Sequence, residues 1–303
     1  MSPTPAWQWP GGARLALSIV VNVEEGSEYS IADGDPIPEP VDELGVMLKK
    51  PVRMHGNESN YRYGIEEGGP RVLALLDRFS FTATWTAAAL SLERAPALAQ
   101  AIGRRIGERG DEVCAHGWRW VHQFRLAEAD ERAFIRRAAD SIKASTGLRP
   151  VGWLSRYLHT EHTRRLLQEE GFLYHMDDYS ADTPFWGPVP GSARPMIIVP
   201  YALDSNDMKM WVAPAYTPRL WLEYAIDSFD ELLAEARRGQ SPPRLMSLGL
   251  HLRIIGRPGR IGALERFFEH VQGAMRGNGD VWITSRRAVA EHFAAQVPAA
   301  TQA

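Results

Sequence analysis

Residues 15–26, LALSIVVNVEEG, decide the fold class of this chain. The first nine of them are almost entirely apolar and rich in branched side chains, which is typical of a strand buried on both faces of a parallel sheet. The run is too short to cross a bilayer. The residues before it lack the basic segment and the small-residue cleavage site of a signal peptide, and we therefore expect a cytoplasmic protein.

Short apolar runs alternate with longer amphipathic stretches along the chain, and this alternation predicts an α/β protein with a mainly parallel sheet. Besides residues 15–23, strands are expected over residues 82–87, 112–115, 151–154, 172–176, 197–201, 245–250 and 281–284. Helices are expected over residues 70–79, 95–109, 128–146, 163–170, 228–238, 262–275 and 286–296.

The composition is that of an ordinary globular protein: of 303 residues, 45% are hydrophobic and 23% are charged. The segment 25–69 breaks the alternation, because it is rich in Gly, Pro and charged residues and has little periodicity. We expect a long loop there, at about residues 25–69. The chain shows no internal repeat and no interdomain linker, so we expect a single domain over residues 1–303.

Charge and cysteine content exclude several function classes. The net charge of −3 provides no overall attraction for nucleic acid or for an anionic membrane, and neither is an expected partner. Cys114 is the only cysteine, which excludes an internal disulfide and a cysteine-rich zinc site and fits a reducing compartment.

Polar side chains follow several of the predicted strands, at the point where each strand ends. Because barrel enzymes carry their reactive groups at the carboxyl ends of the strands, we expect these side chains to converge. They are Asn22, Glu24, Glu25, His116, Ser155, Arg156, Asp177, Asp178, Asp204, Asn206, Asp207, His251 and Arg253. Carboxylates, histidines and arginines at successive strand ends form a coherent hydrolytic set.

Most of these residues also have a purely structural interpretation. One of the adjacent Glu24 and Glu25 faces the opposite side of an extended chain and could simply meet solvent. His116 and His251 could be ordinary buried histidines. Turn, capping or surface roles are equally good or better interpretations for Asp177, Asp178, His122, His159 and His162.

An ordered set of motifs resembles the polysaccharide deacetylase superfamily. The set comprises EEG (24–26), HGWRW (116–120), GWLSR (152–156), SNDM (205–208) and LGLHLRIIGRP (248–258). Further tracts resemble the branch that contains the bacterial allantoinases of purine (urate) catabolism and related cyclic-imide hydrolases. These tracts are ESNYRYG (58–64), RPVGW (149–153), TRRLLQEEGFLY (163–174) and HLRIIGRPGRIGALERF (251–267).

The resemblance implies a distorted, incomplete (β/α) barrel that hydrolyses a C–N bond. In the metal-dependent members a carboxylate and a His-x-x-x-His pair hold one divalent cation. Here His116 supplies the first imidazole, but Trp120 stands four residues on, and indole does not bind metals. The allantoinase branch is similar in being metal-independent, so no tightly bound cofactor is expected; a weak divalent cation at Glu24 and His116 is the open alternative.

The resemblance also implies roles for the remaining polar residues. Glu24, or Glu25 one residue on, is the expected base or water-orienting carboxylate, and His251 is the expected general acid. These three are the predicted catalytic residues. The predicted substrate-binding residues are His116, Trp120, Arg156, Glu58, Tyr61, Asp207, Arg253 and Arg257.

We therefore predict the ring opening of a small polar cyclic substrate, a cyclic amide or ureide such as allantoin, a hydantoin or a cyclic imide. Residues 155–159 and the tract EEGGP after Gly64 differ from the allantoinase pattern, so the reaction class transfers better than the substrate. The alternatives are a metal-dependent carbohydrate or peptidoglycan N-deacetylase and a catalytically silent barrel that binds a small ligand. The proteins that this chain resembles form homo-oligomers, commonly tetramers, so we expect a homo-oligomer.

Overall fold

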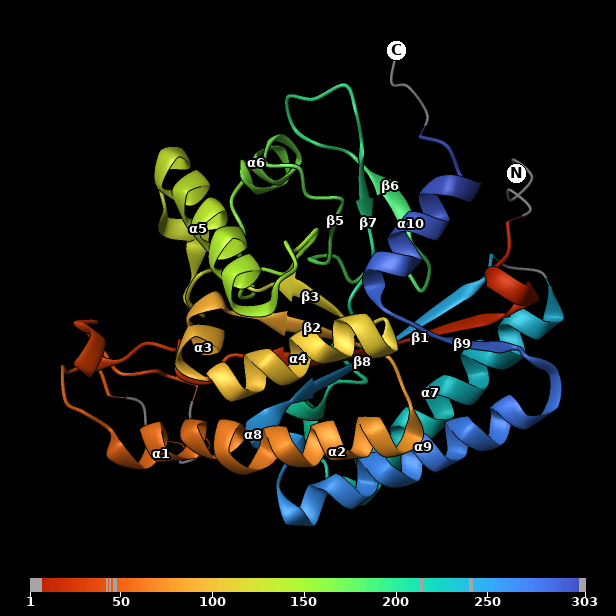
Figure 1. Cartoon of the computed structure of the whole chain (residues 1–303), viewed down its shortest axis with the longest axis horizontal. Coiled ribbons are helices and arrows are strands. Elements are labelled where there is room, and N and C mark those ends of the chain that lie inside the picture. The colour runs from red at the N-terminus through yellow and green to blue at the C-terminus, as the bar shows by residue number, and fades with distance from the viewer. Residues whose placement is uncertain are drawn as a thin grey trace.

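A computed structural model describes residues 7–299 except residues 42, 44, 46, 47, 213, 214, 240 and 241; it does not describe the side chains of residues 277 and 278. Its nine-stranded sheet has the order β6-β7-β5-β4-β3-β2-β1-β8, with β9 also paired to β1 (Figure 1). All neighbouring strands are parallel except β6 and β7. The predicted α/β fold with a curled, incomplete barrel is confirmed.

Strand β1 (Leu15–Val23) is the centre of the sheet, as its apolar sequence predicted. It pairs with β8 (Arg244–His251) along most of its length, with β9 (Val281–Ile283) at its start and with β2 (Ala83–Ala87) at its end. All nine of its residues are buried. The other strands are β3 (Glu112–Ala115), β4 (Gly152–Trp153), β5 (Tyr174–His175), β6 (Phe185–Gly187) and β7 (Met196–Ile198).

The two faces of β1 pack into different layers because its side chains alternate. Leu17, Ile19 and Val21 belong to the main core beneath the outer helices, whereas Ala16 and Val20 belong to a smaller inner cluster. The longer helices of the outer layer are α2 (Gly69–Phe79), α4 (Pro96–Arg109), α5 (Glu128–Thr146), α7 (Pro218–Arg238) and α9 (Pro258–Asn278). Helix α10 (Arg286–Gln296) contributes Val289, Ala290 and Phe293 to the inner cluster.

The barrel stays incomplete because its edge strands, β6 and β8, do not pair with each other. A single bridge between Asn206 and Gly249 links the segment after β7 to β8. Only glycine fits at position 249, since a Cβ there would lie 2.4 Å from the Tyr201 hydroxyl oxygen and 2.6 Å from Nδ2 of Asn206. This close approach brings the tyrosine and the asparagine to the carboxyl end of β8.

The prediction of a long loop over residues 25–69 is wrong for the second half of this segment. Helix α1 (His55–Tyr63) lies there and continues through a π-helical stretch, Gly64–Gly68, directly into α2. The sequence of α1 is polar and has no apolar stripe. Its buried residues are Asn57, Asn60 and Tyr61, so contacts with the rest of the chain, rather than periodicity, hold it in place.

Other elements were missed or cut short. The short elements that the sequence analysis did not predict include strand β6, helix α3 (Ala89–Arg94) and helix α8 (Leu252–Ile255). The short helix α6 (Thr163–Glu169) was predicted. Helix α7 begins ten residues before the predicted start, at Pro218, where the Thr217 side chain caps the backbone N–H of Leu220. Among the described helices, none is long and apolar enough to span a membrane.

Candidate functional site

The carboxyl ends of β1, β3, β4 and β8 meet around one cavity of about 280 Å³. Of the predicted site residues, Glu24, His116, Trp120 and His251 line this cavity. The other lining residues are Asn22, Leu154, Ser155, Tyr157, Tyr179, Tyr201, Leu203, Asn206, Met208, Lys209 and Val212. The expected convergence is therefore observed for six of the thirteen strand-end residues: Asn22, Glu24, His116, Ser155, Asn206 and His251.

Glu24 is the centre of this group. Its Oε2 accepts a hydrogen bond of 2.8 Å from Nη1 of Arg253, and its Oε1 lies 3.4 Å from Nε2 of His116 and 3.3 Å from Nε2 of His251. Burial acts to raise the pKa of Glu24, but the charges of His251 and Arg253 outweigh it and hold the pKa well below its usual range. The carboxylate is therefore ionised at neutral pH.

His251 is held by the carboxylate of Asp207. Nδ1 of the imidazole lies 2.7 Å from Oδ1 of Asp207, and Oδ2 accepts the backbone N–H groups of His251 and Ile255. Burial acts to lower the pKa of His251, but Glu24 and Asp207 outweigh it and raise the pKa to about 9. His251 is therefore an imidazolium at neutral pH, and Asp207, predicted to bind substrate, instead orients this ring from outside the cavity lining.

His116 has a defined tautomer because of its two partners. Nδ1 lies 2.7 Å from the carbonyl oxygen of Leu154, which can only accept, so Nδ1 carries the ring proton. Nε2 is then left with its lone pair and accepts the indole N–H of Trp120 at 3.1 Å. The tryptophan that replaces the second expected histidine thus occupies the nitrogen that a metal would need.

The donor set does not fit a divalent cation at Glu24 and His116. Nε2 of His116 accepts from Trp120, Nε2 of His251 carries a proton, and Oε2 of Glu24 is bound to the guanidinium of Arg253. A cation at this place would have to displace the indole N–H and lie beside a fixed positive charge. The chemistry of the site therefore has to be derived from the side chains alone.

Glu25 points to the other side of the chain. Its Oε1 accepts the backbone N–H of Arg253 at 3.0 Å, and its Oε2 accepts the backbone N–H of Glu24 at 3.1 Å. Burial raises the pKa of Glu25, opposed by the charge of Arg253. The two carboxylates are therefore not equivalent: Glu24 faces the cavity, and Glu25 anchors the segment that carries Arg253.

Arg156 lies behind Trp120 rather than in the cavity. Its guanidinium forms a buried bidentate ion pair with Glu39, at 2.5 and 2.8 Å, and donates to the carbonyl oxygen of Trp120 at 2.7 Å. It also lies over the indole ring, 3.7 Å from its centre. Arg156 therefore holds Trp120 in position, and its partner Glu39 was not singled out in the sequence.

Three further predicted substrate-binding residues do not line the cavity. Glu58 pairs with Arg53 at the surface. Tyr61 is buried, donates its hydroxyl to the carbonyl oxygen of Val41 and lies 4.4 Å from the guanidinium of Arg253. Arg257 hydrogen-bonds Asn60 and lies over another ring, that of Tyr63. Arg253 is also outside the lining and acts through Glu24.

Three tyrosines that line the cavity were not predicted as site residues. Tyr201 accepts hydrogen bonds of 3.1 Å from both Nδ2 of Asn22 and Nδ2 of Asn206. Tyr157 and Tyr179 are half exposed at the rim. Tyrosines after strands are as common in cores as in sites, so only their positions beside Glu24 could have identified them.

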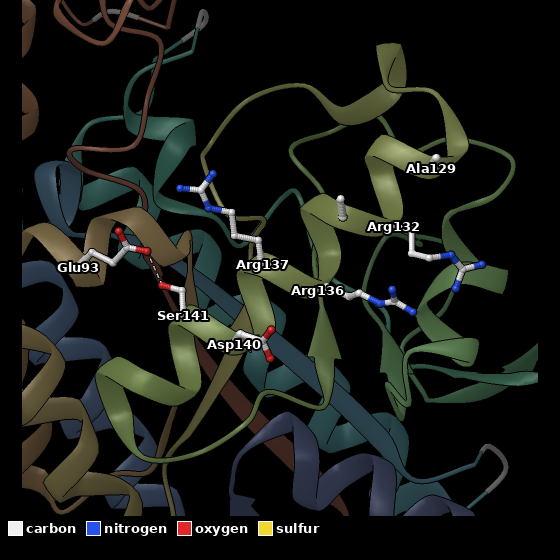
Figure 2. Close-up of a pocket in the computed structure, with 8 residues that line it drawn as sticks. Glu93, Ala129, Arg132, Arg136, Arg137, Asp140 and Ser141 are labelled. Atoms are coloured by element: carbon white, nitrogen blue, oxygen red, sulfur yellow. Dashed lines mark hydrogen bonds between the residues drawn. The ribbon is translucent and has the colours of Figure 1, made fainter.

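A second hollow, of about 540 Å³, lies on the outer surface along α5 (Figure 2). Its arginines do not converge: Arg132 and Arg136 pair with Glu169 and Glu170, and Arg137 lies over the ring of Trp118. Because two of its arginines are already paired with carboxylates and the third stacks on an indole ring, this hollow is not the candidate site.

Comparison with known proteins agrees with this geometry. The model of the polysaccharide deacetylase family matches residues 60–174. A candidate polysaccharide deacetylase of Schizosaccharomyces pombe is 32% identical over 315 residues, which cover 98% of this chain and 95% of that protein. The chain belongs to the polysaccharide deacetylase family. As a member of this family it is a hydrolase of amide C–N bonds.

Solved structures of similar proteins extend the comparison. The PuuE allantoinase is 37% identical, with a TM-score of 0.87, and the match covers 98% of this chain and 95% of that one. A candidate polysaccharide deacetylase from Pseudomonas aeruginosa PAO1 is also 37% identical, with a TM-score of 0.85 and the same coverage. Among relatives found by sequence, a peptidoglycan deacetylase of Helicobacter pylori is 27% identical over 151 residues, about half of each chain (49% and 48%).

Replacing Glu39 should show how strongly the protein depends on the buried ion pair between Glu39 and Arg156. Glu39→Ala leaves the buried guanidinium of Arg156 without its carboxylate, so the free energy of unfolding should fall by about 3–5 kcal/mol. Urea unfolding measures this change. Glu58→Ala removes an exposed pair and should leave both stability and hydrolysis close to wild type. Equal losses in the two variants would contradict the role assigned to Arg156 and Glu39.

Proposed function

We propose that this chain opens the ring of a small cyclic amide or ureide with a water molecule activated by Glu24, without a tightly bound metal. One observation carries the proposal. Oε1 of Glu24 faces the Nε2 atoms of His116 and His251 at 3.4 and 3.3 Å, while Arg253 and the Trp120 N–H take the places that metal binding would need. The 37% identity to the PuuE allantoinase over nearly the whole chain supports this substrate class.

Glu24 is the group that accepts a proton from water. Its Oε1 is directed to the cavity, and Oε2 is held by Arg253, so the carboxylate has one defined position. The low pKa of Glu24 makes it a weak base. A weak base suits a strained or conjugated ring carbonyl, which water attacks more readily than the carbonyl of a simple acetamide.

His251 is the group that donates a proton to the leaving nitrogen. It holds that proton at neutral pH because its pKa is about 9. As the C–N bond breaks, Nε2 gives its proton to the ring nitrogen, while Glu24 holds the proton taken from water. Nε2 of His251 and Oε1 of Glu24 are 3.3 Å apart, so the proton can pass directly from Glu24 to His251 and restore both groups.

Tyr201 is the side chain that stabilises the oxyanion. Its oxygen accepts two amide hydrogens, from Asn22 and Asn206, and among the described residues no acceptor takes its own hydroxyl hydrogen. Burial raises the pKa of Tyr201, so the hydroxyl remains a donor. The hydrogen bonds from the two asparagine side chains fix the position of the tyrosine oxygen and make its hydroxyl a stronger donor. Such a donor stabilises the negative charge that develops on the substrate oxygen.

Lys209 and the rim of the cavity suit a ring with a polar and an apolar side. Lys209 lines the cavity, and none of the salt bridges among the described residues includes it. It can attract a substrate carbonyl or the carboxylate that ring opening releases. Leu203 and Val212 are about half exposed at the rim and present apolar surface to the rest of the substrate.

A substrate screen with and without chelator tests the proposed reaction. Allantoin, hydantoins, dihydropyrimidines, succinimide and N-acetylated sugars should be compared, and a cyclic amide or ureide should be hydrolysed equally well with chelator present. Glu24→Gln keeps the shape of the side chain and removes the base, so kcat should fall by about 10²–10⁴-fold.

The same screen separates the alternatives. Relatives described as deacetylases support an N-deacetylase; sugar deacetylation that chelator abolishes would favour that function over ring opening. A barrel that only binds a ligand would hydrolyse none of these compounds, and Glu24→Gln would leave any binding that is detected unchanged.

The pH dependence follows from the charges of Glu24 and His251. Turnover needs ionised Glu24 and protonated His251, and the raised pKa of His251, about 9, sets the alkaline limit. The value of kcat/KM should stay level through neutral pH and fall about tenfold per pH unit above about pH 9. Asp207→Asn removes a charge that raises this pKa, so the alkaline limb should move to lower pH. Activity that increases through pH 9 would exclude His251 as the acid.

Removing one hydroxyl tests the role of Tyr201. Tyr201→Phe should lower kcat by about 10²–10³-fold and change KM little, because the lost hydrogen bond forms mainly in the transition state. Tyr179→Phe is the matched control, since it removes a hydroxyl at the rim of the same cavity. A similar loss in both variants, or a change confined to KM, would contradict this assignment.

A further inference from the structure

A second group of titratable side chains lies beside the candidate site, at the carboxyl ends of β4 and β5. It consists of His159, His175 and Asp177, whose ligand atoms all lie within 4.8 Å of one another. His175 is the last residue of β5, Asp177 follows two residues later, and His159 comes from the segment after β4. The proposed hydrolytic mechanism uses none of the three.

The burial of these side chains gives the group an inner and an outer side. His175 is fully buried and Asp177 is 7% exposed, whereas His159 reaches the surface. The His159 and His175 rings meet edge to face, with centres 5.3 Å apart. His159 is therefore the exposed member of the group, and His175 and Asp177 are its buried members.

One carboxylate oxygen of Asp177 is buried without a partner in the described part of the chain. Its Oδ2 contacts Nε2 of His175 and accepts the backbone N–H of Ser155 at 2.8 Å, but Oδ1 is buried and has no hydrogen-bond partner among the residues that the structure describes. Leaving a buried carboxylate oxygen unpaired costs free energy, so such an oxygen calls for a cation or a donor. Burial acts to raise the pKa of Asp177, but the neighbouring His175 outweighs it and keeps the pKa below its usual value.

The His159 imidazole can offer a lone pair, and the His175 imidazole can do so once it loses a proton. Burial and the nearby His175 lower the pKa of His159, which favours its neutral form. Nε of Arg164 donates to Nδ1 of His175 at 3.4 Å, so the ring proton of His175 is on Nε2, towards Asp177. A metal ion at Nε2 has to displace this proton, as is usual when histidine binds a metal.

We propose that His159, His175 and Asp177 bind one zinc ion at a site separate from the catalytic centre. Two imidazole nitrogens and one carboxylate oxygen are a ligand set that zinc accepts, with water in the fourth position. Tetrahedral zinc holds its ligand atoms about 3.3 Å apart, given metal–ligand distances of about 2.0–2.1 Å. Rotation of the exposed His159 ring is the movement that closes the present group to that spacing.

The site has a direct connection to the cavity of the hydrolase. Ser155, whose backbone N–H is bound by Asp177, lines that cavity. A zinc ion on Asp177 would therefore fix the segment that carries Ser155 and Tyr157. Its role is to hold the wall of the cavity rather than to contact the substrate.

Titration of the full-length, chelator-treated protein with zinc tests the proposal. Calorimetry should show one zinc ion per chain, and cobalt in its place should give the visible absorption of a tetrahedral complex. His159→Ala changes an exposed residue and should lower zinc affinity by at least about 100-fold, the upper end of what loss of a supporting residue costs. Circular dichroism before titration checks that the variant is folded.

Two control variants make the outcomes distinct. His162→Ala removes an imidazole three residues away that pairs with Glu128 and Glu161 instead, and it should bind zinc as the wild type does. His116→Ala tests the position of the expected superfamily metal and should also retain binding. No stoichiometric zinc in the wild type, or equal affinity in His159→Ala, would overturn the proposal.

The result can be separated from that of the proposed function. Zinc binding that is lost in His116→Ala but kept in His159→Ala would place the metal at the hydrolytic centre and contradict both proposals. Loss of zinc binding in His159→Ala, together with ring opening that persists under chelator in the wild type, would support both. Zinc binding at His159 without any ring opening would support the metal site alone.

Discussion

The buried guanidinium of Arg253 is the group on which the rest of the site depends. It is fully buried, it binds Glu24 at 2.8 Å and lies 3.5 Å from Glu25, and its own backbone N–H is bound by Glu25. The rings of Tyr61, Trp120 and Trp211 lie around it at 4.4–5.4 Å. A buried charge is tolerated only with such compensation, so the position of each neighbour is constrained by this one cation. Its charge also keeps Glu24 ionised and thereby sustains the imidazolium of His251.

This constraint explains why the segment before α2 is ordered although it has no apolar pattern. Glu39 pairs with Arg156, and Tyr61 lies over Arg253, so the segment provides the outer wall of the site. The π-helical stretch Gly64–Gly68 packs closely on Glu25 at one end and on α8 at the other, so neither end has room for a side chain. A Cβ at Gly64 would lie 2.5 Å from Oε1 of Glu25, and one at Gly68 would lie 2.1 Å from the carbonyl oxygen of Leu252. The glycines of this segment serve close packing rather than flexibility.

The sequence alone was enough to predict the parts of the molecule that depend on local patterns. The bounds of β1, β3, α5 and α10 agree with the predicted ranges. The rule that polar residues after parallel strands converge correctly brought Glu24, His116 and His251 together. This rule could not tell whether Glu24 or Glu25 faces the cavity, because the answer depends on the direction in which the chain turns after Val23.

Features that depend on contacts between distant segments could not be predicted. Arg156, Glu58 and Arg257 were assigned to substrate by resemblance, but each already has a partner elsewhere in the chain. His159 and Asp177 were interpreted as a surface and a turn residue, and His175 fell within a predicted strand without being singled out, because only the fold places a loop histidine beside the end of β5.

The pairing of Arg253 with Glu24 also determines how the site obtains its positive charge when the protein is made. The guanidinium of Arg253 is part of the polypeptide, so each newly made chain already carries one such charge. The charge reaches the site when the chain folds. It needs no loading step, does not exchange with the metals of the surroundings and cannot be replaced by a competing ion. The same permanence limits adaptation, because the charge at this centre can be altered only by changing the chain, and Glu24, Glu25 and His251 would have to change with it.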